Sequence, residues 1–118
     1  MGRLTTHVLD TSSGLPASGL ALALWAIDAE GGRRLLKRTV TNADGRVDAP
    51  LLEGEALVPG TYELVFAVGD YFRTRGLVLS EPAFLDEIPL RFGVAAGTAH
   101  LHVPLLVAPY AYSTYRGS

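Results

Sequence analysis

The chain has 118 residues, of which 48% are hydrophobic and 19% charged, and its formal net charge is −2 at pH 7. This length is typical of one domain, which we expect to span residues 1–118. No basic face stands out, so the sequence predicts no nucleic-acid partner. Because the chain contains no cysteine, disulfides, thiol nucleophiles and cysteine-bound zinc are excluded.

The hydropathy pattern bears on where the protein acts. The chain enters a patterned strand at once and shows no apolar core of a signal peptide. It also has no apolar run of about 18 residues, the length that a membrane-spanning helix needs. The sequence therefore predicts a cytoplasmic protein with no membrane partner.

Short apolar runs separated by glycine and proline recur along the chain, a pattern typical of a β-sandwich. In chain order we expect strands at 4–9, 20–27, 34–40, 51–52, 61–68, 84–94, 99–107 and 110–116. Clusters of turn-forming residues separate them, at 10–16, 31–32, 41–45, 59–60 and 108–109. The prediction is an all-β fold, a two-sheet antiparallel sandwich of about eight strands with one short helix.

Two of these predicted elements carry local signals. Pro89 interrupts the strand at 84–94 and favours an edge or a bulge, because proline cannot donate to a sheet. The short helix is expected at 70–75, with Asp70 as its N-cap and Gly76 as its stop. In the turn at 41–45, Gly45 suits a positive φ.

No sequence motif of a serine hydrolase, a phosphate-binding loop or a zinc protease is present, so attention falls on single polar residues. His7 lies in the first predicted strand. Thr5 shares its face of that strand, whereas Thr6 and Val8 point to the other face. A solvent-facing strand histidine is the plain alternative to a functional one.

His100 and His102 are two residues apart on a predicted strand and therefore share a face. Three histidines on strands are compatible with a zinc site. A polar face of an antiparallel sheet explains the pair at least as well. The pattern alone does not decide between the two interpretations.

Three further polar residues, Arg46, Tyr115 and Ser118, are weak functional candidates when each is considered alone. Arg46 follows an Asp-Gly turn, where most arginines are simply solvated. Tyr115 and Ser118 lie close to a terminus, where an exposed tail is the ordinary expectation. The segment that holds them is aromatic and β-branched almost to its end, which indicates that it is docked against something.

Taken together, four segments resemble the transthyretin-like family, and specifically its hydrolase branch. The likeness spans the whole chain, and the terminal Tyr-Arg-Gly-Ser is specific to that branch. Ala108, Ala111 and Leu101 depart from the residues that are common in the family, which bears on the shape of the channel that the resemblance implies between two dimers. The matching segments are Leu4-Thr-Thr-His-Val-Leu-Asp-Thr11 with Gly14-x-Pro-Ala17, Thr41-Asn-x-Asp-Gly-Arg46, Gly60-x-Tyr-Glu-Leu64, and His100-x-His-Val-Pro-Leu-Leu106 running on to Pro109-Tyr110 and Tyr112–Ser118.

The resemblance implies a site and an activity. It implies that His7, Arg46, His102 and Ser118 are catalytic and that His7, Arg46 and Tyr115 bind the substrate. The implied reaction opens the ring amide of 5-hydroxyisourate to give 2-oxo-4-hydroxy-4-carboxy-5-ureidoimidazoline, a step of urate degradation in purine metabolism. The resemblance also implies a homotetramer with its sites between dimers.

The resemblance implies no cofactor. We expect no required metal either, because Arg46 would repel a divalent cation at the same site. The sequence leaves open which histidine, His7 or His102, is the general base, and what His100 does.

A rival hypothesis is a non-catalytic carrier of small ligands in the same family. Carriers lack the terminal Tyr-Arg-Gly-Ser and replace the two histidines and the arginine. All of these residues are present here, so the sequence favours the hydrolase. A structural module of a larger assembly would need linker-like flanks, which the sequence does not show.

Overall fold

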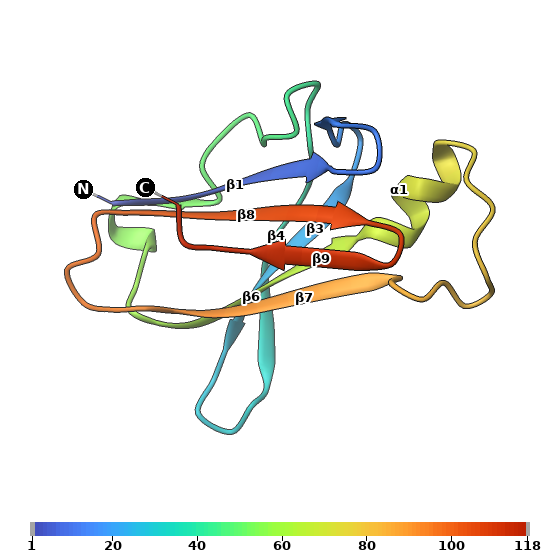
Figure 1. Ribbon diagram of the computed structural model, residues 1–118. Coiled ribbons are helices and arrows are strands. Elements are labelled where there is room, and N and C mark those ends of the chain that lie inside the picture. Colours follow the sequence, from blue (N-terminus) through green and yellow to red (C-terminus); the bar gives the residue numbers. More distant parts are fainter. Residues whose placement is uncertain (1, 118) are drawn as a thin grey trace.

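The computed structural model describes residues 2–117 and contains two β-sheets packed face to face (Figure 1). The predicted two-sheet sandwich is therefore confirmed. The first sheet contains β1 (Arg3–Asp10), β2 (Leu15–Pro16), β5 (Leu52–Glu53), β8 (His100–Ala108) and β9 (Ala111–Thr114). The second sheet contains β3 (Ala21–Ile27), β4 (Arg33–Val40), β6 (Gly60–Ala67) and β7 (Glu87–Val94). The helical elements are the 3₁₀-helix η1 (Gly54–Ala56) and the α-helix α1 (Val68–Thr74).

The strand order is β2-β1-β8-β9 in the first sheet, where β5 also pairs with β1, and β4-β3-β6-β7 in the second. Every pair in these two sheets is antiparallel except β1 and β8, which run parallel. The antiparallel prediction thus holds for every other pair. The chain reaches β8 by crossing over from β7 in the other sheet, so no hairpin forces β8 to oppose β1.

The alternation of β1 sets the two faces of the first sheet. Leu4, Thr6, Val8 and Asp10 are buried, whereas the side chains between them lie on the outer face. The inner face packs against the second sheet in one hydrophobic core. Burial of each large side chain in that core contributes roughly 1.5–3 kcal/mol. The largest fully buried hydrophobic residues are Phe66, Phe72, Leu4, Leu20, Leu24, Leu64, Ile88 and Leu105.

The helix α1 begins two residues earlier than predicted. Asp70 is not its N-cap, because the helix starts at Val68 after Ala67, which makes no side-chain capping bond. The helix follows β6 directly, since β6 ends at Ala67 and α1 begins at Val68. The buried side chains of Val68 and Phe72 anchor this first turn in the core. Gly76 follows the helix with a φ of 87°, as expected of the stop residue. Within residues 2–117, no helix has the length and apolarity needed to cross a membrane.

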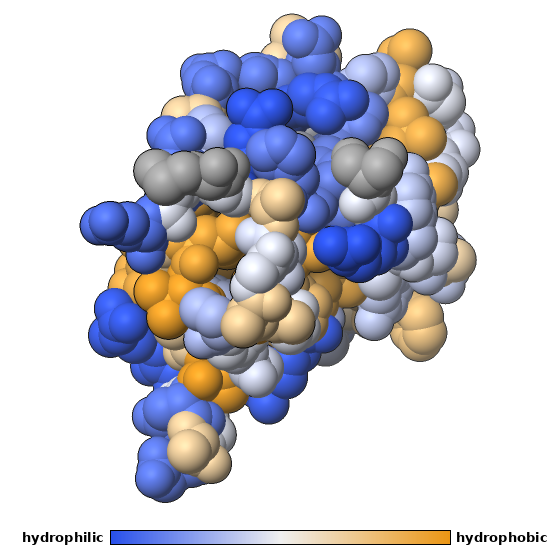
Figure 2. Space-filling model, turned by 90° about the vertical axis from the view of Figure 1, so that its left-hand side faces the viewer, coloured by the Kyte–Doolittle hydropathy of each residue, from blue (hydrophilic) through white to orange (hydrophobic). Residues whose placement is uncertain are grey.

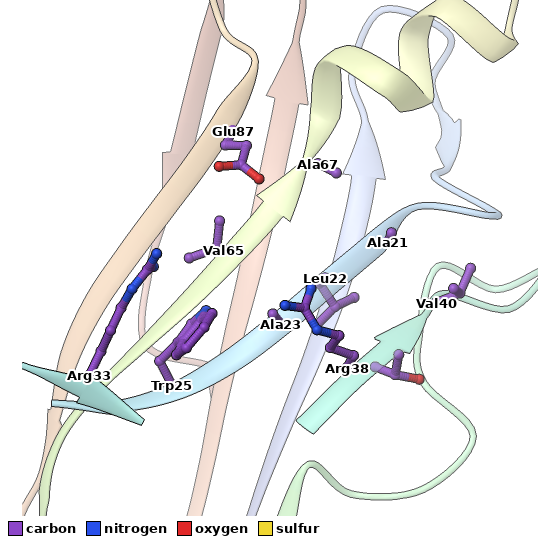
Figure 3. Close-up of a pocket in the computed structure, with 11 residues that line it drawn as sticks. Ala21, Leu22, Ala23, Trp25, Arg33, Arg38, Val40, Val65, Ala67 and Glu87 are labelled. Atoms are coloured by element: carbon purple, nitrogen blue, oxygen red, sulfur yellow. The ribbon is translucent and has the colours of Figure 1, made fainter. Parts of the chain in front are cut away.

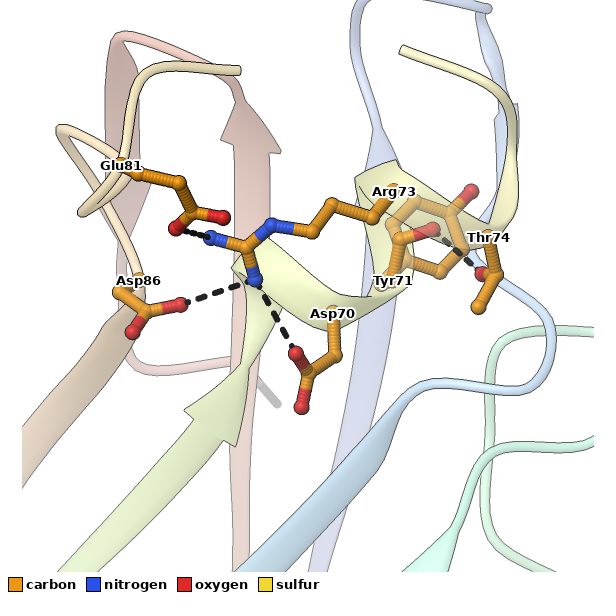
Figure 4. Close-up of polar contacts among 6 residues, drawn as sticks. All are labelled: Asp70, Tyr71, Arg73, Thr74, Glu81 and Asp86. Atoms are coloured by element: carbon orange, nitrogen blue, oxygen red, sulfur yellow. Dashed lines mark hydrogen bonds and ion pairs between the residues drawn. The ribbon is translucent and has the colours of Figure 1, made fainter. Parts of the chain in front are cut away.

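The Arg73 guanidinium holds α1 to the loop that precedes β7 (Figure 4). It pairs with Asp70 at 3.1 Å, Glu81 at 3.2 Å and Asp86 at 3.5 Å. The predicted start of this strand at Phe84 is wrong, because residues 84–86 belong to the loop and β7 begins at Glu87.

The reason for the late start of β7 is the length of its partner strand. Glu87 pairs with Ala67, the last residue of β6, so no strand is left for residues 84–86 to join. Phe84 is instead 69% exposed. Pro89 lies in β7, and β7 is an edge strand of the second sheet. The edge position that the proline predicted is therefore confirmed. Two further differences are that β2 forms within the predicted turn 10–16 and that β9 ends at Thr114 rather than at 116.

Candidate active site

Three of the predicted site residues, distant in sequence, come together on the outer face of the first sheet. The imidazole rings of His7 on β1 and His102 on β8 lie with their centroids 6.5 Å apart. Arg46 joins them through an isolated antiparallel bridge between its backbone and that of His7. The parallel pairing of β1 and β8 therefore assembles one cluster from opposite ends of the chain.

Arg46 is positioned by the turn that precedes it. The backbone N–H of Asn42 donates to the carbonyl of Arg46 at 2.7 Å. The Asn42 side-chain oxygen accepts from the backbone N–H groups of Asp44 at 2.9 Å and Arg46 at 3.2 Å. Gly45 has a φ of 74° and lies against the carbonyl of Val8, so a side chain would fit neither its backbone nor the available space. This turn presents Arg46 at the strand that carries His7.

The electrostatic surroundings keep both histidines neutral near pH 7. Burial, followed by the charge of the Arg46 guanidinium, lowers the pKa of His7 below 6.5, although the backbone and charge of Asp44 oppose this. Burial and then Arg46 lower the pKa of His102 as well, with a smaller contribution from His7. Each neutral imidazole has one unprotonated nitrogen that can accept a proton.

An open depression of about 360 Å³ is lined by Arg46 and His102 of this cluster, whereas His7 is not among the residues that line it. Its volume suits a small ligand. Its lining includes two arginines and two histidines and no carboxylate, so its electrostatic potential favours an anion or a carbonyl-rich molecule. His100, opposite Arg3 in the sheet register, is exposed and lies in the same depression. The lining residues are Arg3, Thr5, Thr6, Arg46, Val47, His100 and His102.

Two of these residues, Arg3 and Thr5, were not singled out as functional from the sequence. The period-two alternation that places Thr5 beside His7 was the available signal. Across the sheet, Thr5 lies opposite His102, and its Oγ1 is 2.8 Å from Nδ1 of that histidine. This contact could not be found from the sequence, because it depends on the parallel register of β1 and β8.

The C-terminal residues take different positions. Tyr115 is 60% exposed and lines a separate apolar groove between β7, β8 and β9 rather than the histidine depression. Its predicted role in substrate binding stays a prediction. Ser118 lies outside the described residues. The backbone N–H of Gly117 donates to the carbonyl of His102 at 2.8 Å, which docks the end of the chain against β8 as the sequence indicated. Figure 2 views this end of the sandwich and shows hydrophobic residues at its centre with hydrophilic residues around them.

The three sequence departures lie on different faces. Leu101 is 5% exposed and faces the core, because residues of β8 alternate and His102 points outward. Leu101 also lines the groove between β7, β8 and β9, and its effect on the shape of the channel stays a prediction. Ala108 and Ala111 pair with each other across β8 and β9.

The two-sheet sandwich is the fold of a transthyretin-like protein. The two imidazoles and the guanidinium on its outer face are groups that a hydrolase can use. Residues 4–117 match the HIUase/Transthyretin family, and the chain belongs to this family. It is 62% identical over 118 residues to a 5-hydroxyisourate hydrolase of Ralstonia nicotianae, covering 100% of both chains.

Solved structures agree with this assignment. The chain is similar to the structure of Klebsiella pneumoniae 5-hydroxyisourate hydrolase, with a TM-score of 0.82, 36% identity and 100% of both chains covered. It is also similar to sea bream transthyretin in complex with thyroxine, with a TM-score of 0.86 and 26% identity over 98% of this chain and 94% of that one. The fold is thus shared by both branches, while sequence identity is higher to the hydrolases.

Proposed function

We propose that this protein hydrolyses 5-hydroxyisourate, opening a ring amide to give 2-oxo-4-hydroxy-4-carboxy-5-ureidoimidazoline in urate degradation. The full-length identity to a 5-hydroxyisourate hydrolase supports this assignment. The structural observation that carries it is the convergence of His7, Arg46 and His102 beside one depression, which Arg46 and His102 line. These groups supply a proton acceptor and a fixed positive charge, which amide hydrolysis needs.

The chemistry follows from these groups. One neutral imidazole, of His7 or His102, takes a proton from water as the water oxygen bonds to the amide carbon. The negative charge that develops on the carbonyl oxygen is stabilised by the guanidinium of Arg46. The protonated imidazole then returns its proton to the amide nitrogen as the C–N bond breaks, and the new carboxyl group ionises. Arg46 also orients the flat substrate, since its planar fork can donate to two acceptors.

The carrier hypothesis is less well supported by the same residues. The depression is lined by ionisable and polar side chains, among them Arg46 and His102, whereas an apolar aromatic ligand would favour an apolar wall. The two hypotheses make different predictions in solution. A carrier would bind its ligand saturably without turnover, whereas a hydrolase consumes it.

We also propose that the protein is a homotetramer. Its support is an uncharged edge strand, β9, whose sequence is Ala-Tyr-Ser-Thr and whose side chains are all exposed. Uncharged, exposed edge strands are avoided in monomers because they pair with other chains. Tyr110 and Leu15 add exposed hydrophobic area, at 69% and 63%. Light scattering should give the mass of four chains at micromolar concentration, and a monomer would contradict this proposal.

The functional test follows the ultraviolet absorbance of 5-hydroxyisourate with and without the protein, after subtraction of its spontaneous decay. His7→Ala and His102→Ala should each lower kcat by about 100-fold or more, as expected for loss of a general base or its partner. A chain lacking Ser118 should also be slower.

His100→Ala is the matched control, because His100 shares a strand face with His102 but lies one pleat further along. It should cost much less than His102→Ala. Each variant is checked for an unchanged oligomeric state. Near wild-type turnover in both His7→Ala and His102→Ala would leave the reaction without its base, and the carrier hypothesis would replace it. The cytoplasmic location also stays a prediction, which cell fractionation would test.

A further inference from the structure

The ring of His102 is held at two places, and the first is its Nδ1 atom. Thr5 Oγ1 lies 2.8 Å from Nδ1, within hydrogen-bond distance. Thr5 sits directly opposite His102 in the parallel register of β1 and β8, so two paired strands fix the position of its hydroxyl. This register places the two side chains next to each other on the same face of the sheet. Nδ1 is therefore engaged within the protein.

The second restraint on His102 is Gly117. A Cβ atom at position 117 would lie 2.6 Å from Cδ2 of the ring and 3.1 Å from both Cβ and Cγ. Real Cβ atoms are essentially never found as close as the first of these distances. Gly117 is buried, and its backbone N–H donates to the carbonyl of His102 at 2.8 Å. The backbone of Gly117 thus packs against the Cγ–Cδ2 edge of the ring, and a larger residue would displace it.

Among residues 2–117, these two contacts leave Nε2 as the ring nitrogen without a partner. The Nδ1 side is occupied by Thr5 and the Cγ–Cδ2 edge by Gly117. His102 also lines the depression that holds Arg46. Nε2 is therefore the nitrogen of His102 that can exchange a proton with a bound molecule.

The type of group that contacts Nδ1 also matters. A hydroxyl can both donate and accept, whereas a backbone carbonyl can only accept. Thr5 can therefore bond to Nδ1 whether or not that nitrogen carries a proton. When Nε2 is the unprotonated nitrogen, Nδ1 carries the proton and donates to Thr5 Oγ1. The same bond is kept when Nε2 gains a proton, so the ring need not turn over.

We propose that Thr5 and Gly117 are positioning residues that hold His102 with Nε2 facing the depression, so that it can take and return a proton during turnover. This role rests on the proposed hydrolysis, and it explains why glycine occupies the third position of the terminal Tyr-Arg-Gly-Ser. Neither residue needs to touch the substrate. Their effect is exerted through the orientation and protonation of His102.

The test compares Thr5→Val, Thr5→Ser and Gly117→Ala with wild type. Thr5→Val keeps the shape of the side chain but removes the hydroxyl, so kcat should fall by about tenfold or more while KM stays within about twofold. Thr5→Ser restores the hydroxyl and should recover most of this loss. Gly117→Ala should lower kcat by a similar factor, because its methyl group would push the ring away from Thr5.

The matched control is Thr11→Val. The Thr11 hydroxyl also donates across to β8, to the carbonyl of Val107 at 3.2 Å, but it lies away from the depression. This variant should retain kcat within about twofold. Light scattering and the thermal midpoint establish that each variant keeps the assembly and fold of wild type.

A second readout does not depend on activity. Nitrogen NMR of labelled imidazoles reports which ring nitrogen carries the proton, and we expect the signals of His102 to change in Thr5→Val but not in Thr11→Val. Unchanged kcat and unchanged His102 signals in Thr5→Val would overturn the positioning role. If wild type does not accelerate the decay of 5-hydroxyisourate, the proposed function fails, while the NMR comparison still decides whether Thr5 controls His102.

Discussion

The outer faces of the two sheets both carry an arginine-containing hollow, but they differ in chemistry. On the first sheet a depression of about 360 Å³ lies over Arg46 and His102. On the second sheet a hollow of about 500 Å³ is bordered by Trp25, Arg33 and Arg38 (Figure 3). The second hollow is the larger of the two. Size and positive charge alone would therefore point to the wrong face.

The difference is in what surrounds the arginines. Alanine and valine side chains form the floor of the second hollow, and the Arg33 guanidinium lies 4.1 Å from the centroid of the Trp25 ring. No histidine lines it. The first face instead places Arg46 beside two histidines whose pKa values it lowers. A guanidinium near neutral proton acceptors, rather than cavity volume, distinguishes the candidate active site.

The largest expected effect on kcat/KM comes from replacing Arg46 by lysine, with the same replacement of Arg38 on the second face for comparison. Arg46→Lys should lower kcat/KM by about 100-fold or more, because a point charge does not reproduce the two-pronged guanidinium. Arg38→Lys, on the second face, should remain within about twofold of wild type. Steady-state hydrolysis of 5-hydroxyisourate measures both. Equal effects of the two substitutions would remove the functional distinction between the faces.

The pH dependence of the hydrolysis rate tests whether Arg46 acts on the two histidines of the first face. Burial and Arg46 hold the pKa values of His7 and His102 below 6.5, so the base form persists until the pH falls below that value. The rate should rise with pH through a midpoint below 6.5 and then level off. In Arg46→Gln, NMR titration should show both histidine pKa values rising, because the neighbouring positive charge is gone. Unchanged titrations would mean that Arg46 does not act on them.

The same pKa shifts predict a smaller effect on stability. A histidine whose pKa is lower in the folded state binds protons more readily when unfolded. The free energy of unfolding should therefore be fully retained above pH 6.5 and decrease as the pH falls from 6.5 towards the folded-state pKa values. Denaturant unfolding of wild type and His102→Gln should show a weaker pH dependence in the variant. If the free energy of unfolding decreased by the same amount in wild type and in His102→Gln, the pH dependence would come from groups other than His102.

The smallest expected effect concerns the second face alone. Arg33→Ala removes the cation–π contact with Trp25 and should lower the free energy of unfolding by about 0.5–1 kcal/mol. Turnover should not change, because this contact lies on the other sheet from His7 and His102. Chemical denaturation and the hydrolysis assay test the two halves of this prediction. A loss of turnover would show that the second face contributes to function.

Local pattern was sufficient to predict most of the fold and part of the site. The alternation in β1 placed His7 and Thr5 on one face, and the Asn-Ala-Asp-Gly turn before Arg46 was visible as a turn. Features that depend on pairing between distant strands were not predictable. The late start of β7 follows from where β6 ends, and the contact of Thr5 with His102 follows from a parallel register.

The parallel pairing of β1 with β8 has a consequence for biosynthesis. The hydrogen bond between Thr5 and His102 joins residues 97 positions apart in a chain of 118, and Gly117 pairs with the same histidine. Contacts of such long sequence separation form late and slow folding. A nascent chain still being translated, or one clipped before Gly117, therefore lacks the fully positioned His102. The appearance of turnover would then report that synthesis has passed Gly117 and that β1 and β8 have paired.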